Sequence, residues 1–94
     1  MSATIVIHIK DRQLDDVYIG RPGPWGNPIP LKSEASRDIV CDMHWTWLHS
    51  NDPRAVWVRT HIELLRGRRL ACYCYPKRCH GDNFIRYLKE NNHA

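Results

Sequence analysis

The chain has 94 residues, 43% of them hydrophobic and 26% charged, and a chain of this size supports one hydrophobic core and therefore a single domain over residues 1–94. This composition excludes a disordered chain, and the longest apolar run, residues 5–7, is far shorter than the roughly 20 residues that span a bilayer. Fourteen Lys and Arg against ten Asp and Glu give a net charge of +4, which favours anionic partners without naming one.

The N-terminal residues and the cysteines bear on the cellular compartment. Residues 1–4 contain no basic segment that leads into an apolar one, so no secretory signal is predicted and we expect a cytoplasmic protein. In that compartment the four cysteines are expected to be reduced. They are therefore structural, metal-binding or reactive rather than disulfide-bonded.

Two short strands and a loop are predicted in the first third of the chain. Residues 4–9 are β-branched and barely alternate, which is typical of a strand in the middle of a sheet. A second strand is predicted at residues 17–19. Residues 20–30 then hold four of the six prolines and three of the five glycines, so they predict a stiff loop.

Two helices, a strand and a third helix are predicted after the loop. Ser33 begins a helix over 34–49 with an inner face of Ile39, Val40, Met43 and Trp47. Asp52 and Pro53 begin a second helix, which ends at Gly67 and has an inner face of Ala55, Val58, Ile62 and Leu65. A strand follows at 70–74, and the last helix opens at Gly81 and Asp82 with an inner face of Phe84, Ile85 and Leu88.

This order of elements indicates an α/β fold, a small Rossmann-like layered domain with a short, mostly parallel sheet packed by three helices. In open sheets of this type, ligands lie beyond the carboxyl ends of the strands. The loop at 20–30 follows one strand, and a segment rich in cysteine and histidine follows another. We therefore expect both segments to face one cleft.

The loop contains residue types that suit an anionic ligand with a flat ring. Arg21 can form two hydrogen bonds to a phosphate, Trp25 offers a stacking face, and Asn27 can bind a polar edge. Gly20 and Gly26 complete the candidate ligand-binding residues of this loop. The alternative is a proline-stiffened loop whose Trp25 fills the small core.

The start of the last helix is a second candidate site. Lys77, Cys79 and Gly81 stand beside unpaired helical N–H groups, which predicts an anion-binding site. His80 and Asp82 are the candidate catalytic residues, as an acid–base pair, although Asp82 can also serve only to cap the helix. A further alternative makes Cys79 a thiolate nucleophile at the helix start.

A zinc site at the same segment is considered and not favoured. Cys72, Cys74, Cys79 and His80 match a tetrahedral Cys3His set in type, but their spacing is not that of ordinary zinc sites. We therefore expect no cofactor and small, buried cysteines. The helical Trp45, Trp47 and Trp57, and the pair Cys41 and His44, are also interpreted as structural.

Two motifs carry a resemblance to a known family. The chain resembles the domain-of-unknown-function family 4326 of bacteria and phages in both motifs. The first motif runs from Gly-Arg-Pro to Trp-Gly-Asn-Pro over 20–28, and the second from Leu-Ala-Cys-Tyr-Cys to Cys-His-Gly-Asp over 70–82. Similar sequences tend to have Trp in place of Tyr73 and Pro in place of Arg78. The resemblance implies a small intracellular α/β domain, in the host cytoplasm where a phage encodes it, with one site built from both motifs. It implies no reaction.

The sequence thus favours a protein that binds a nucleotide or nucleoside-like anion between the loop and the last helix, with cleavage or transfer of its glycosidic or phosphoester bond as a further expectation. One alternative is a non-catalytic protein that sequesters such a ligand. Another is a zinc-stabilised nucleic-acid module, which is disfavoured because the basic residues are spread along the chain and match no nucleic-acid motif. The core is thin, so a homodimer is also considered, and no membrane partner is expected.

Overall fold

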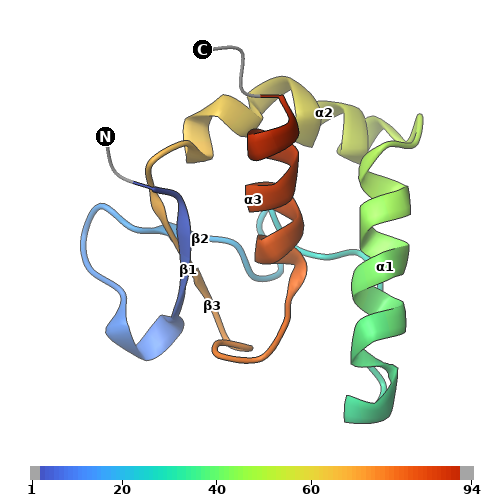
Figure 1. Ribbon diagram of the computed structural model, residues 1–94, viewed down its shortest axis with the longest axis horizontal. Helices are drawn as coiled ribbons and strands as arrows, with labels where there is room; N and C mark the ends of the chain where they lie inside the picture. The colour runs from blue at the N-terminus through green and yellow to red at the C-terminus, as the bar shows by residue number, and fades with distance from the viewer. Residues whose placement is uncertain (1–2, 92–94) are drawn as a thin grey trace.

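The computed structural model describes residues 3–91, which form a three-stranded sheet and three α-helices (Figure 1). The strands are β1 (Ile5–His8), β2 (Val17–Tyr18) and β3 (Arg69–Cys72). The helices are α1 (Arg37–Leu48), α2 (Pro53–His61) and α3 (His80–Glu90), with short 3-10 segments η1 (Ile9–Asp11), η2 (Glu34–Ser36) and η3 (Ile62–Leu65). The predicted α/β class is confirmed. Residues 1–2, part of the segment in which no secretory signal is predicted, lie outside the described residues.

The sheet is entirely parallel, with the strand order β1-β3-β2. Leu70 of β3 lies opposite Val6 of β1 on one side and Val17 of β2 on the other. The prediction that the first strand is central is therefore wrong, because β3 occupies the centre. The run of β-branched residues in β1 is only half-buried, whereas Leu70 and Ala71 are completely buried. An unbroken apolar run identifies a strand but does not distinguish an edge position from a central one.

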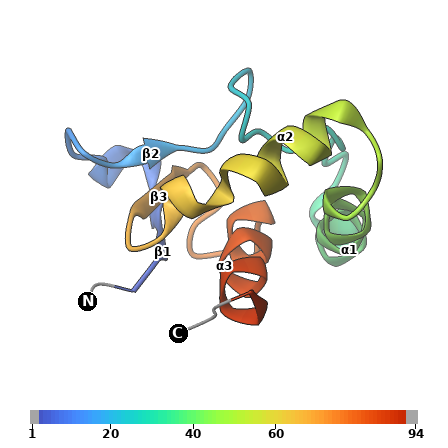
Figure 2. The same cartoon turned by 90° about the horizontal axis from the view of Figure 1, so that it is seen from above.

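The helices are layered on the sheet. Both views place α3 between the sheet and α1, while α2 runs across one end of the helical layer (Figures 1 and 2). Gly81 in the first turn of α3 allows this close contact with the sheet, because a Cβ atom there would lie 2.8 Å from Ile19 Cδ1 and 2.9 Å from Val6 Cγ2. The core between these layers contains Ile19, Leu48, Leu65, Leu70 and Phe84.

Helix α2 follows its predicted start and inner face. The Asp52 carboxylate accepts a hydrogen bond from the Arg54 N–H at 2.9 Å, and Pro53 is the first helical residue. The chain tightens into η3 and then turns at Gly67, whose φ of 76° favours glycine. All four residues of the predicted inner face are buried, namely Ala55, Val58, Ile62 and Leu65.

Helix α1 differs from its prediction in start and in orientation. The segment predicted as its first turn is the separate η2, and Ser33 makes no side-chain cap there. Ile39 is 62% exposed and Met43 is 49% exposed, so the predicted inner face is wrong for these two residues, whereas Val40 is buried as predicted and Trp47 is half-buried. The buried residues are Val40, Cys41, His44 and Leu48.

A polar contact explains this orientation of α1. The Asn83 side-chain amide of α3 donates hydrogen bonds to the Cys41 carbonyl at 2.8 Å and to His44 Nδ1 at 2.9 Å. Both acceptors lie on the same face of α1, so these bonds turn that face toward α3. The spacing of apolar residues does not predict that a histidine is buried, because the hydrogen-bond partner that allows its burial lies on another element.

The last strand and helix are shifted slightly from their predicted bounds. Strand β3 ends at Cys72 instead of residue 74, and the chain then turns with the Lys77 N–H donating to the Cys74 carbonyl at 2.7 Å. Helix α3 begins at His80 with Cys79 as its N-cap, one residue before the predicted opening. Within residues 3–91, no helix has the length and apolarity that crossing a membrane requires.

Candidate functional site

A cavity of about 280 Å³ lies beside the carboxyl ends of β2 and β3. We call it the sheet-edge cavity. Five of the predicted site residues line it together, namely Gly20, Arg21, Asn27, Cys79 and His80. The loop after β2 and the start of α3 therefore meet at the edge of the sheet where ligands of open parallel sheets bind.

His80 holds these two segments together. Its Nε2–H donates to the Ile19 carbonyl at 2.6 Å, and the ring also contacts the backbone of Trp25. The ring is buried, and this burial lowers the pKa of His80 below its usual range. A neutral imidazole whose N–H is bonded to a carbonyl fixes the start of the loop against α3. In this geometry His80 is a positioning residue.

The sheet-edge cavity has a positive electrostatic character. Two arginines line it beside the neutral His80, and no Asp or Glu of residues 3–91 does. Arg37 is engaged, since it pairs with Glu34 at 2.6 Å and donates to the Arg78 carbonyl at 3.0 Å. The Arg21 side chain is exposed and makes no hydrogen bond or ion pair with any residue that the structure describes, although the Arg21 carbonyl accepts a hydrogen bond from the Tyr18 hydroxyl at 2.9 Å. Arg21 is therefore the cation of this cavity that is available to a ligand.

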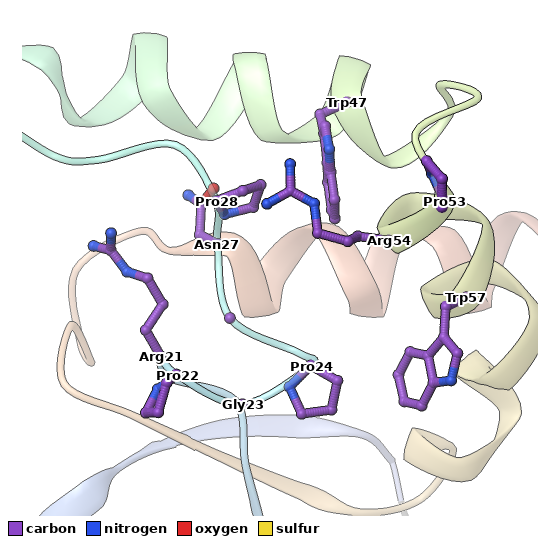
Figure 3. A pocket seen from close by; sticks show the side chains of 11 residues that line it. Arg21, Pro22, Gly23, Pro24, Asn27, Pro28, Trp47, Pro53, Arg54 and Trp57 are labelled. Atoms are coloured by element: carbon purple, nitrogen blue, oxygen red, sulfur yellow. The ribbon is translucent and has the colours of Figure 1, made fainter.

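A second cavity of about 600 Å³ adjoins the first, and we call it the tryptophan groove (Figure 3). Arg21 and Asn27 line both cavities. Figure 3 shows the proline-rich loop on one side of the groove, with Trp47 of α1 and Trp57 of α2 on the other. Its remaining lining residues are Pro22, Gly23, Pro24, Gly26, Pro28, Pro53 and Arg54.

Trp25, the predicted stacking residue, lies in the core beneath this groove. Its side chain is 8% exposed and packs edge to face on Trp57, with ring centres 5.1 Å apart, and on Phe84 at 5.8 Å. The structure thus shows the alternative arrangement, in which Trp25 fills the small core. Trp57 is 37% exposed and Trp47 is half-buried, so these two rings present the aromatic surface.

Sequence analysis missed the two groove tryptophans because both lie in helices with core-like spacing. Trp47 is fixed by its own indole N–H, which donates to the Asp52 carboxylate at 3.1 Å. Asp52 is also the N-cap of α2. The cap that starts α2 therefore also sets one wall of the groove.

Two other predicted site residues lie elsewhere. The Asp82 carboxylate accepts a hydrogen bond from the Cys79 N–H at 3.0 Å and completes a capping box. Lys77 and Asp82 line a separate cavity of about 690 Å³ beside β1 and α3. His80 and Asp82 thus do not share a cavity, and the acid–base pair considered from the sequence is not assembled here. Gly81 packs against the sheet as described above.

The side chains of the cysteines and His80 are not arranged as a group of metal ligands within the described part of the chain. No three His, Cys, Asp or Glu side chains of residues 3–91 converge in a way that could hold a metal ion. Cys72 and Cys79 are in direct contact, with their sulfur atoms 3.2 Å apart, while His80 Nε2 is directed at the Ile19 carbonyl.

Residues 7–90 match the model of a family described as Domain of unknown function (DUF4326). The chain belongs to the DUF4326 family. An uncharacterised 12.4 kDa protein from the nrdA-td intergenic region of Enterobacteria phage T4 is 37% identical over 67 residues, which cover 71% of this chain and 61% of the phage protein. Uncharacterised protein R718 of Acanthamoeba polyphaga mimivirus is 29% identical over 112 aligned positions, covering 95% of this chain and 82% of that protein. No solved structure matches this DUF4326 chain.

Proposed function

We propose that this DUF4326 protein binds a nucleotide-like anionic small molecule, with its anionic group in the sheet-edge cavity and its flat ring in the tryptophan groove. The observation that carries the proposal is the position of the Arg21 side chain, which has no ion-pair or hydrogen-bond partner among residues 3–91 and lines both cavities. A ligand with a charged end and an apolar end would occupy the two cavities at once.

The sheet-edge cavity suits the anionic end. The planar Arg21 guanidinium offers paired N–H groups to phosphate oxygens, and the cavity wall presents no carboxylate from residues 3–91 to repel them. Asn27 adds an amide beside it, although its Oδ1 already accepts a hydrogen bond from the Ile29 N–H at 2.9 Å. The amide nitrogen of Asn27 therefore remains as a second donor.

The tryptophan groove suits the flat end. Its walls are the indoles of Trp47 and Trp57 and the rings of four prolines, which are rigid apolar surfaces (Figure 3). Arg54 in the groove is already paired with Asp52 at 2.9 Å, so it adds little free charge. A heteroaromatic base is therefore a better occupant than a second anionic group.

The geometry favours binding without bond cleavage. His80 is held by a backbone carbonyl and Asp82 by the start of its own helix, so neither side chain is positioned to exchange a proton with a ligand in the cavity. This observation supports the non-catalytic sequestering protein over the enzyme. Cleavage of a glycosidic or phosphoester bond therefore forms no part of the proposal.

Thermal unfolding with small probes tests the proposed function. AMP is expected to raise the melting temperature of the wild-type protein more than adenosine or inorganic phosphate, because only AMP fills both cavities. Arg21→Ala should remove this shift. Arg86→Ala is the matched control. This variant loses the same charge, but Arg86 pairs with Glu90 on α3 and lines neither cavity.

Three results would contradict the proposal. They are the absence of any shift with AMP and other nucleotides, an unchanged shift in Arg21→Ala, and an equal loss in Arg86→Ala. A larger shift with a single-stranded oligonucleotide than with AMP would favour the nucleic-acid alternative instead.

A further inference from the structure

Cys72 and Cys79 form a buried pair of thiols that the proposed function does not use. Cys72 is the last residue of β3 and Cys79 is the N-cap of α3, and their sulfur atoms are 3.2 Å apart. Both line the sheet-edge cavity. Two thiols from separate elements that touch at the wall of a cavity are arranged for chemistry with each other and with a small molecule in the cavity.

The contact distinguishes the two sulfur atoms. The Cys79 thiol hydrogen bond, together with the backbone N–H groups of Cys74 and Tyr75, lowers the pKa of Cys72 to about 6. The same contact, together with burial, raises the pKa of Cys79. The pair thus favours a thiolate on Cys72 and a protonated thiol on Cys79. The thiolate is the nucleophilic form of cysteine, so Cys72 is the attacking sulfur.

We propose that Cys72 and Cys79 form a redox-active dithiol whose substrate is a small peroxide such as hydrogen peroxide. The Cys72 thiolate attacks one peroxide oxygen and the O–O bond breaks, giving a sulfenic acid on Cys72 and a hydroxide that takes up a proton to become water. Cys79 Sγ then attacks the Cys72 sulfur and loses its proton, and the sulfenic hydroxyl leaves as a second water molecule. The two sulfurs lose two electrons, the peroxide gains them, and the product is a Cys72–Cys79 disulfide.

The cavity is large enough to give a small peroxide access to the two sulfurs. Both sulfurs are buried, but the cavity that they line has a volume of about 280 Å³. A water molecule occupies about 30 Å³ in the liquid, so this space admits a molecule of the size of hydrogen peroxide. The sulfurs need to approach by only about 1 Å to reach a disulfide bond length.

The other two cysteines are less suited to this reaction. Cys41 also lines the cavity, but burial raises the pKa of its thiol, so the thiol stays protonated. Cys74 lines the cavity as well and is half-buried, but its sulfur has no cysteine partner among the described residues. The disulfide is therefore expected to be selective for Cys72 and Cys79.

Peroxide titration followed by alkylation and mass spectrometry tests the proposal. Reduced protein treated with one equivalent of hydrogen peroxide should lose 2 Da and two of its four alkylatable thiols, and dithiothreitol should restore both thiols. Trypsin cleaves after Lys77 and Arg78, so a disulfide between peptides 70–77 and 79–86 reports the bond to Cys79. Cys74→Ser then identifies Cys72 as the other partner, because it leaves one cysteine in the first peptide.

Matched serine variants separate the reaction from a structural role. Cys79→Ser keeps a helix-capping side chain, and it should form no disulfide and should leave a Cys72 sulfenic acid that dimedone traps. Cys74→Ser should form the disulfide as the wild type does. The proposal is overturned if the wild type keeps four thiols, if Cys74→Ser abolishes the cross-link, if Cys79→Ser cross-links equally well, or if the purified protein holds one equivalent of zinc on these thiols.

Discussion

His44 makes the stability of the fold sensitive to acid. It is completely buried on α1, and its ring lies 5.4 Å from the rings of both His80 and Phe84. Nδ1 accepts a hydrogen bond from Asn83, while Nε2 has no hydrogen-bond partner among the described residues. Burial, with a smaller contribution from nearby His80, lowers the pKa of His44 from 6.5 to about 3. A proton on this ring would be enclosed by apolar and aromatic groups.

The pKa difference sets the sign and the magnitude of the effect. Between pH 6.5 and about 3 the unfolded chain binds a proton at His44 that the folded chain does not, so acidification favours unfolding. The contribution of His44 is fully present above pH 6.5 and falls by about 1.4 kcal/mol for each pH unit below it. His44 alone should therefore lower the free energy of unfolding by about 2 kcal/mol between pH 7 and pH 5.

Urea denaturation followed by far-UV circular dichroism at pH 7, 6 and 5 measures this loss. His44→Asn retains an acceptor for Asn83 but does not titrate, so its stability should fall by about 2 kcal/mol less than that of the wild type over this range. His49→Asn, at the exposed end of the same helix, should keep the acid sensitivity of the wild type. Equal pH dependence in His44→Asn and the wild type would refute the reasoning.

Two further predictions concern packing, and the same denaturation assay checks both. Gly81→Ala should destabilise the fold by about 1 to 3 kcal/mol, because the new methyl group overlaps Ile19. Gly23→Ala is the control, because the atom nearest to its new methyl group would lie 3.5 Å away. An equal loss of stability in Gly23→Ala would contradict the prediction. Trp25→Ala should cost about 3 to 5 kcal/mol and Trp57→Ala less, because only Trp25 is buried. A stable Trp25→Ala that loses only ligand binding would make Trp25 a stacking residue instead.

The local signals in the sequence predicted the elements well. The Asp52–Pro53 start of α2 and the glycine turn that follows η3 are visible because capping and turns depend on a few neighbouring residues. The meeting of the loop and the start of α3 was also predictable, since both follow parallel strands. The same rule placed Arg21 at the candidate site.

The features that depend on distant contacts were not predictable. The rotation of α1 is set by Asn83, which lies about forty positions away in the chain, and no periodicity within α1 reports that contact. The predicted roles of Trp25 and Trp57 differ from their positions in the structure for a similar reason. The composition of the loop and of α2 does not indicate which of the two tryptophans is buried. That depends on the packing of Trp25 against Trp57 and Phe84.

The central position of β3 has a consequence for synthesis on the ribosome. Val6 and Val17 both lie opposite Leu70, so each N-terminal strand has its hydrogen-bonding partner more than fifty residues further along the chain, and the two do not pair with each other. A nascent chain that has not yet exposed residues 69–72 therefore contains strand sequences but no sheet. One later segment completes both edges, so the sheet forms in a single step after residues 69–72 have emerged, at the slow rate that long-range parallel pairing imposes.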